Sequence, residues 1–369
     1  MATVISFIII FGLIVLAHEL GHYLLGRKNG ITVTEFFIGM GPTLFSFEKG
    51  GTKFSLKLFP IGGACLFEGE TGNSIEKNEE GNETDNENQE AITEISEGSF
   101  LRASVGARFS TILAGPIFNF LLAYLIGLVI IGYIGIDLPV IDYVSPGGQA
   151  EAAGLMPGDV VTKINNEKIH IYRQIFFISF TSRGEPLDVT FERNGEKNQV
   201  TIIPRYNDEL GRYVIGINAG GENTKTGSLS LFKNAYYEVK FGMVSTLKSL
   251  KMLVQGQLSA DNIAGPVGMA SMVGETYEMA RPHGMGIVIL NMLNIAMILS
   301  VNLGIMNLLP IPALDGGRLI FIILEMIRGK PIPPEKEGMV HLAGMIALML
   351  LMVFVLYNDI AQIFAKRLS

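Results

Sequence analysis

The sequence predicts a multi-pass α-helical membrane protein with a β-hairpin and one small inserted α+β domain. Of its 369 residues 49% are hydrophobic and only 17% are charged, whereas soluble domains carry about a quarter charged residues. Four long apolar stretches predict the helices. Residues 136–220 have a different character, with short strand-like runs separated by Gly, Pro and Asn turns, which predicts the inserted domain.

About four transmembrane helices are predicted, because four stretches approach the ~20 apolar residues that cross a bilayer as a helix. They run from Thr3 to Leu25, Phe109 to Ile134, Ile287 to Leu309 and Met339 to Tyr357. The first lacks the basic n-region of a signal peptide and contains charged residues that cleavage would remove. We therefore expect it to be retained as a span.

The segment between the first two spans divides into a hairpin and an acidic loop. Residues 31–68 alternate with a two-residue period around Gly50 and Gly51, which predicts a β-hairpin. Residues 70–99 are rich in Glu, Asn, Gly and Thr, and we expect a disordered loop. This segment alone contributes −9 to the net charge of −7 and the rest of the chain is near +2, so the acidity is local. No basic stripe suggests a nucleic-acid partner.

Four parts follow from these patterns: an N-terminal membrane part (1–135), the inserted domain (136–220), a helical linker (221–286) and a C-terminal membrane part (287–369). Within the linker, residues 229–253 have helical apolar spacing with interleaved lysines. Such a helix lies near a membrane surface or packs on the inserted domain, and the sequence leaves both readings open.

Basic residues near the spans predict the orientation. They place the segment between the first two spans and the segment between the last two on the cytoplasmic side, and the inserted domain outside. Lys366 and Arg367, after the last span, argue for the opposite orientation. The residues that support the predicted side are Arg27, Lys28, Arg102, Arg108, Arg318, Arg328 and Lys330.

The first span ends in HELGH, at residues 18–22. Side chains four residues apart lie on one face of a helix, so His18 and His22 can bind one metal ion with Glu19 beside them. Polar residues that merely occupy a helix end are the alternative. Uncompensated ionisable groups near hydrocarbon are costly, however, and they mark functional sites by default.

A catalytic zinc site takes three protein ligands and leaves one position open. Asp315 is the leading candidate for the third ligand, because two prolines interrupt the apolar segment just before it. Irregular backbone at membrane depth is tolerated chiefly where it lines a cavity. Taken alone, Asp315 would read as a turn residue. We expect His170, His283 and His341 to be surface or interfacial residues.

These motifs resemble the site-2 protease family of intramembrane zinc metalloproteases, in its bacterial branch that carries a PDZ domain. HELGH at 18–22 in the first span, AGPIFN at 114–119 in the second and SVNLGIMNLLPIPALDGG at 300–317, which we assign to the third, match in family order. SPGGQAEAAGLMPGD at 145–159, followed by VVTKINNEKI at 160–169, resembles a PDZ module. Larger relatives carry two PDZ domains, and residues 136–220 have room for only one.

The resemblance implies a zinc endopeptidase that cuts single-span membrane proteins, such as anti-sigma factors or remnant signal peptides, in or near their transmembrane segment. It implies one Zn²⁺ per chain, held by His18, His22 and Asp315, with Glu19 activating water. Asn302 and Asn307 match residues that hold the substrate backbone, although hydrogen bonding between helices is an alternative role. Family-motif support comes from Gly115, Pro116 and Asn119.

The resemblance also implies that the hairpin at 31–68 is membrane-reentrant. It places the protein in the bacterial cytoplasmic membrane, in contact with the lipid bilayer, with the active site towards the cytoplasm and the PDZ-like domain outside. Two other classes were weighed. A scaffold without catalysis is disfavoured because all four expected catalytic residues are present. A transporter is disfavoured because no pair of related halves is visible.

Overall fold

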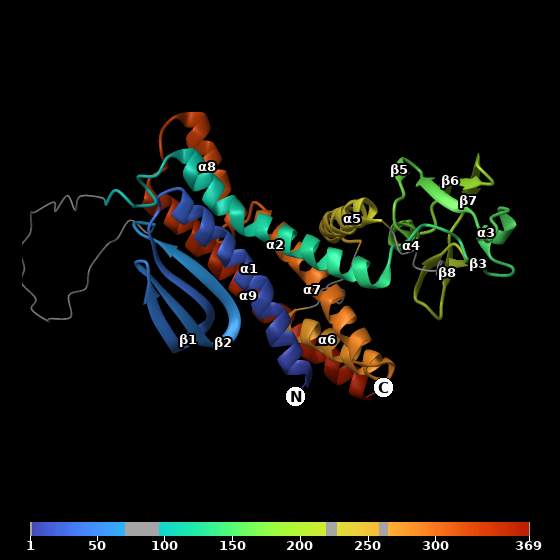
Figure 1. Ribbon diagram of the computed structural model, residues 1–369, viewed down its shortest axis with the longest axis horizontal. Helices are drawn as coiled ribbons and strands as arrows, with labels where there is room; N and C mark the ends of the chain where they lie inside the picture. Colours follow the sequence, from blue (N-terminus) through green and yellow to red (C-terminus); the bar gives the residue numbers. More distant parts are fainter. Residues whose placement is uncertain (1, 71–95, 219–226, 258–264, 369) are drawn as a thin grey trace, which may run out of the picture. The chain divides into compact units, whose positions relative to one another are not determined.

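The computed structural model describes residues 2–70, 96–218, 227–257 and 265–368 (Figure 1). Two units can be distinguished within it: residues 1–122 with 252–369, and residues 123–251. The predicted acidic loop lies almost wholly outside the described residues. The candidate site lies in the first unit, and the inserted domain in the second.

Within the part of the chain that the structure describes, four helices are long and apolar enough to cross a membrane: α1 (Ala2–Lys28), α2 (Val105–Ile134), α7 (Met285–Leu308) and α9 (Pro334–Leu368). They coincide with the four predicted spans. In the first unit α1 contacts α7, and the shorter helix α6 (Pro266–Ala280) contacts α1, α7 and α9. The N-terminus of α6 receives the buried carboxylate of Asp359 from α9, which accepts hydrogen bonds from the Gly265 and Gly268 N–H groups at 3.0 and 2.8 Å.

Asp315 was assigned to the third span from the sequence, and this assignment is corrected by the structure. Helix α7 ends at Leu308, and Asp315 is the first residue of a separate amphipathic helix, α8 (Asp315–Arg328). Pro310 and Pro312 lie between the two helices. Since proline has no N–H group to donate, the helical ladder cannot continue through this segment. The segment between the two helices therefore carries Asp315 away from the axis of α7.

The predicted hairpin is present as β1 (Val33–Lys49) and β2 (Thr52–Phe67), beside α1 (Figure 1). Its turn uses Gly50 and Gly51, both with positive φ, a conformation that glycine adopts without strain. The start of β1 pairs with both ends of β2, so that Phe36 lies opposite Cys65 and Phe54. Insertion of the hairpin into a membrane stays a prediction.

One end of the hairpin packs into the core of the first unit, and its opposite end is exposed and apolar. The buried cluster joins the hairpin to α2 and α8, and contains Ile31, Val33, Phe36, Cys65, Phe67, Phe100, Ile112, Leu319 and Ile322. Met40 and Phe59, which pair at the other end, and Phe45 and Phe47, on the outer strand, are about half exposed. The hairpin is therefore fixed at the end that approaches α1 and α8.

The second unit contains an antiparallel sheet in the order β5-β4-β6-β7. Its strands are β4 (Val160–Ile164), β5 (Glu167–Lys168), β6 (Leu187–Arg193) and β7 (Glu196–Ile202). The second unit also contains helices α3 (Gln149–Ala152) and α4 (Tyr172–Thr181). Two short antiparallel pairs complete it. Strand β3 (Tyr143–Val144) pairs with β10 (Ile217–Asn218), and β8 (Arg205–Asn207) pairs with β9 (Arg212–Val214). Alternating apolar residues of the strands and helices form one buried core.

Helix α5 (Ser228–Val254) fits the predicted amphipathic segment. Its Ala235 is buried against Ile131 and Ile136. On the domain side, the Tyr237 ring stacks on His170 with centroids 3.8 Å apart, and Lys248 forms an ion pair with Glu167. Of the two readings of this helix, these contacts favour packing on the inserted domain.

Candidate metal centre

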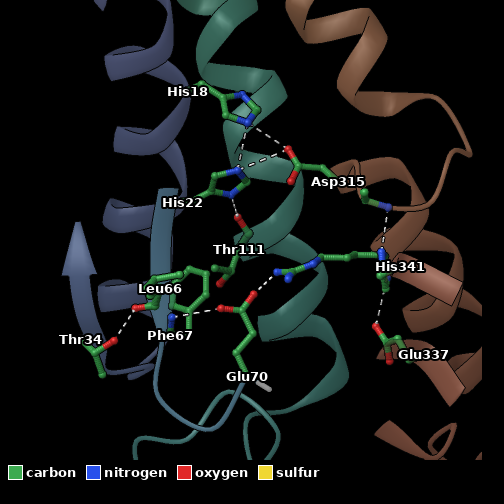
Figure 2. Close-up of polar contacts among 12 residues, drawn as sticks. His18, His22, Thr34, Leu66, Phe67, Glu70, Thr111, Asp315, Glu337 and His341 are labelled. Carbon is green, nitrogen blue, oxygen red and sulfur yellow. Dashed lines mark hydrogen bonds and ion pairs between the residues drawn. The ribbon is translucent and has the colours of Figure 1, made fainter. Parts of the chain in front are cut away.

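Helix α1 carries both histidines of HELGH on one face, where they are buried. Their Nε2 atoms lie 3.3 Å apart and point to a common position (Figure 2). The two rings meet edge to face, with centroids 4.8 Å apart. The helical spacing thus brings together the two imidazoles that the sequence predicted.

The third group is the carboxylate of Asp315, which reaches the same position from the start of α8 (Figure 2). Its Oδ2 atom lies 3.1 Å from His18 Nε2 and 3.3 Å from His22 Nε2. This oxygen is buried, and among the described residues it receives no hydrogen bond. A buried carboxylate oxygen without a donor is costly, and a cation in this position would remove the cost.

The donor set and its spacing fit zinc. Two imidazole nitrogens and one carboxylate oxygen are a known set for a catalytic zinc with one open position. Zinc–ligand bonds of about 2.0–2.1 Å in tetrahedral geometry place neighbouring ligand atoms about 3.3 Å apart. The three distances here are 3.3, 3.1 and 3.3 Å. His18, His22 and Asp315 are therefore arranged to hold one zinc ion.

The other nitrogen of each ring is held by α2. His22 Nδ1 donates to the backbone carbonyl of Thr111 at 2.9 Å. The amide of Asn119 lies 3.1 Å from His18 Nδ1 and is fully buried. If its Oδ1, which otherwise lacks a partner, faces the ring, it accepts the proton that Nδ1 carries when Nε2 binds a metal. Both contacts direct Nε2 towards Asp315.

Glycines allow α2 to approach α1 this closely. A Cβ atom added to Gly115 would lie 2.3 Å from His22 Nε2, and one added to Gly21 would lie 2.4 Å from the Ala114 carbonyl oxygen. Pro116 follows within α2 and is buried. Gly115 and Asn119, which were supported in the sequence only by a family motif, therefore contact the candidate metal ligands His18 and His22.

Glu19 faces the hairpin from the same turn of α1, and it is buried. Its carboxylate is hydrogen-bonded by the backbone of Cys65 in β2. A Cβ atom added to Gly63 would lie 3.2 Å from Glu19 Cγ, so the strand passes directly over this side chain. The contact fixes the predicted general base beside the metal ligands.

A cavity of about 740 Å³ opens beside the three ligands. It is lined by His18, Glu19, His22 and Asp315, and by residues 62–67 of β2. Asn307 also lines it, with its Nδ2 atom 3.5 Å from His18 Nε2. Asn302 is half-buried one and a half turns earlier in α7, and it does not line this cavity. Of the two predicted asparagines, Asn307 therefore reaches the site and Asn302 does not.

Two ion pairs join the cavity wall to neighbouring segments. Arg108 of α2 pairs with Glu325 of α8 at 2.6 Å, and Arg318 of α8 pairs with Glu70. The sequence analysis used Arg108 and Arg318 only as markers of sidedness. Their acidic partners could not be predicted, because each pair joins segments that are distant in the sequence.

The three remaining histidines do not join the metal ligands. His170 stacks on Tyr237 in the second unit, and His283 lies exposed in a 3₁₀ turn (Arg281–His283). His341 of α9 lines the cavity and accepts a hydrogen bond from the Ala313 N–H group. The expectation that none of them is the third ligand agrees with these positions.

Comparison with known proteins identifies the family of this fold and site. The model of peptidase family M50 matches residues 6–351. The chain belongs to peptidase family M50. The resemblance to site-2 proteases, stated from three short motifs, is thereby confirmed over nearly the whole chain.

Several curated relatives of this M50 peptidase match along their full length. Zinc metalloprotease RasP of Geobacillus kaustophilus is 35% identical, with 98% of each chain covered. Regulator of sigma-W protease RasP of Bacillus subtilis is also 35% identical, over 98% of this chain and 99% of that protein. Probable protease eep of Enterococcus faecalis is 32% identical, over 99% and 100%.

Solved structures that are similar to part of the chain include the PDZ domain of the SdrC-like protein from Listeria monocytogenes. It is 23% identical and covers 24% of this chain and 88% of that domain, with a TM-score of 0.18. A similarity at this level carries no argument about function. The PDZ-like character of residues 136–220 stays a prediction.

Proposed function

We propose that this zinc metalloprotease hydrolyses a peptide bond in or beside the transmembrane segment of single-span membrane proteins. His18, His22 and Asp315 bind the zinc ion, and Glu19 is the general base. The observation that carries the proposal is the convergence of three ligand atoms, 3.1–3.3 Å apart, at the base of a cavity among apolar helices long enough to span a membrane.

Zinc held by His18, His22 and Asp315 would supply Lewis acidity, which would polarise the substrate carbonyl and make water more acidic. Glu19 takes the proton of the attacking water and then delivers it to the leaving amine. The backbone of Cys65 holds the Glu19 carboxylate in place for both transfers. Asn307, on the opposite wall of the cavity, is positioned to donate a hydrogen bond to the substrate backbone.

A membrane helix must unwind before its peptide bonds can reach the metal, and the freed backbone groups then need partners. Residues 62–67 of β2 border the cavity beside Glu19 and suit the addition of an extended substrate strand. Residues 54–58 of the same strand lie outside the cavity lining. Charged residues introduced at Ala64 or Leu66 should therefore impair cleavage more than the same residues introduced at Leu56 or Leu58.

The proposed substrates are membrane-anchored regulators such as anti-sigma factors, with remnant signal peptides as a second group. The name of the Bacillus subtilis relative, a regulator of sigma-W protease, supports the first group. We further propose that the enzyme lies in the bacterial cytoplasmic membrane with its active site towards the cytoplasm. In support, Arg108 and Arg318 belong to segments predicted as cytoplasmic, and both line the same cavity.

The inserted domain, in this proposal, lies outside and restricts entry of substrates whose external part has not been trimmed. Deletion of residues 140–218 should then permit cleavage of an untrimmed substrate. Cleavage that still depends on trimming after the deletion would contradict this role.

Co-expression with a tagged single-span anti-sigma factor tests the main proposal. Wild type should shorten the substrate, and Glu19→Gln should leave it intact while still containing about one zinc per chain. Glu48→Gln, on the exposed part of the hairpin, is the matched control and should cleave like wild type. Equal cleavage by Glu19→Gln and wild type would refute the assigned base.

A further inference from the structure

The segment that presents Asp315 has a backbone conformation that its own residues disfavour. It runs from Leu309 to Leu314, between α7 and α8. Ala313, two residues before the carboxylate, has φ +75°. Residues with a Cβ atom rarely adopt this left-handed conformation. Contacts from outside the segment must therefore hold it.

One such contact comes from the fourth predicted span. His341 of α9 accepts a hydrogen bond from the Ala313 N–H group at its Nδ1 atom, over 2.9 Å (Figure 2). Because Nδ1 is the acceptor, Nε2 carries the proton of the neutral ring, and it faces the Glu337 carboxylate at 3.7 Å. The ring also packs against Phe321 of α8, with centroids 5.4 Å apart. Packing on Phe321 supports the ring orientation in which Nδ1 meets Ala313, and Nε2 has no hydrogen-bond partner among the described residues.

A second contact lies one turn further along the same face of α9. A Cβ atom added to Gly344 would lie 2.4 Å from Pro312 Cβ and 2.7 Å from the Pro312 carbonyl oxygen. The backbone of α9 therefore lies directly against Pro312. This close approach brings His341 within reach of Ala313, since residues three apart share a helix face.

We propose that His341 is a positioning residue for the metal ligand Asp315. By accepting the Ala313 N–H it holds the segment in the form that presents the carboxylate to His18 and His22. The fourth span thereby takes part in assembling the metal site without supplying a ligand. The inference rests on the proposed function, because it takes Asp315 to be a zinc ligand.

Zinc affinity of the purified full-length protein, measured by competition with a chelator, tests the inference without reference to activity. His341→Asn and His341→Gln form the main comparison. The Oδ1 atom of asparagine can occupy the place of Nδ1 and accept the Ala313 N–H, whereas the amide of glutamine extends to the position of Nε2. We expect His341→Asn to bind zinc within about threefold of wild type and His341→Gln to bind about 10–100-fold more weakly.

A second pair of variants leaves His341 untouched. Gly344→Ala should push α9 away from Pro312 and weaken zinc binding in the same range. Gly338→Ala, on the same helix with no atom within 4 Å of the added Cβ, is its matched control. The thermal midpoint of the metal-free protein, measured in parallel, should be the same for His341→Asn and His341→Gln, because the lost contact acts on the metal site.

Equal zinc affinity in wild type and His341→Gln would overturn the inference. Equal losses in the asparagine and glutamine variants would also overturn it, because they would show that the Nδ1 acceptor is not what matters. A wild-type protein that binds no zinc would instead refute the proposed function, which keeps the two failures distinct.

Discussion

The Asp315 carboxylate lies 3.1 Å from His18 Nε2, although the two residues come from opposite ends of the chain. This relationship depends on close packing of α1 against α2, on the proline-containing segment before α8 and on the hydrogen bonds behind each ring. Each of these supports can be tested separately.

Gly115→Ala should disrupt the metal site. The added Cβ would lie 2.3 Å from His22 Nε2 and 2.8 Å from His18 Cε1, so the rings must move or the helices must separate. We expect zinc content to fall to less than about a tenth of wild type, as expected when ligand geometry is lost. Gly132→Ala, on the same helix with open space around the added Cβ, should retain full zinc content. Normal zinc content in Gly115→Ala would contradict the helix packing described here.

Asn119→Leu removes the polar partner of His18 Nδ1 and keeps the side-chain volume similar. Partners behind metal-bound histidines typically contribute 10–100-fold in metal affinity, and we expect a loss of about that size in a chelator competition. Asn291→Leu, which removes only a bond to the Ile287 carbonyl within α7, serves as the control. Unchanged affinity in Asn119→Leu would show that His18 is oriented by other contacts.

The ion pair of Arg108 with Glu325 should contribute to stability mainly through its burial. Both side chains are largely buried, so Arg108→Met leaves a carboxylate without a partner and should cost about 3 kcal/mol in the free energy of unfolding. The double variant with Glu325→Met should recover most of that loss. Unfolding in mixed micelles measures both.

The exposed pair of Arg281 with Glu278 is the control for this measurement. Arg281→Met should change the free energy of unfolding by less than about 0.5 kcal/mol. A double variant of Arg108 and Glu325 that is less stable than Arg108→Met would contradict the account of the buried pair.

One half-buried and one buried carboxyl of the second unit should make its stability depend on pH. Burial raises the pKa of Asp137 and of Glu238, and nearby Arg173 only partly offsets this. A carboxyl with a raised pKa binds its proton more tightly in the folded state, so stability rises as the pH falls through the raised pKa towards the ordinary value. The thermal midpoint of the second unit, within the full-length protein, should therefore increase from about pH 7.5 to about pH 5.

Glu238→Gln should reduce this increase and raise the midpoint at about pH 7.5, because the amide carries no buried charge. Glu209→Gln, at an exposed position, should leave the pH profile unchanged. A midpoint that falls steadily with acidification, equally in wild type and Glu238→Gln, would contradict the assignment.

The parts of the fold that depend on local patterns could be predicted from the sequence. The four long helices follow from uninterrupted apolar runs, and the hairpin follows from two-residue alternation around Gly50 and Gly51. Helix α6 lies within the predicted helical linker, although its bounds were not predicted. Helix α8 was missed, because it has only 14 residues and begins with Asp315-Gly316-Gly317 after two prolines. Gly316 and Gly317 are poor helix formers at its start, so the strongly amphipathic pattern that follows did not suggest a helix.

The closeness of His18 and His22 could be predicted because their spacing places them on one helix face, whereas the groups that orient their rings could not be predicted. Thr111 contributes a backbone carbonyl, which leaves no trace in its side-chain identity. His341 was weighed only as a possible ligand, and its contact with Ala313 depends on where α9 lies in space. Sequence patterns therefore identified the reactive groups, and tertiary packing determined what orients them.

X-ray absorption at the zinc edge, on purified wild type and on His18→Ala, His22→Ala and Asp315→Ala, tests the central claim most directly. The account predicts a wild-type spectrum with two imidazole ligands and a carboxylate oxygen at about 2.0–2.2 Å, and loss of that signature in each variant. A two-imidazole spectrum that persists after either histidine is removed would contradict it.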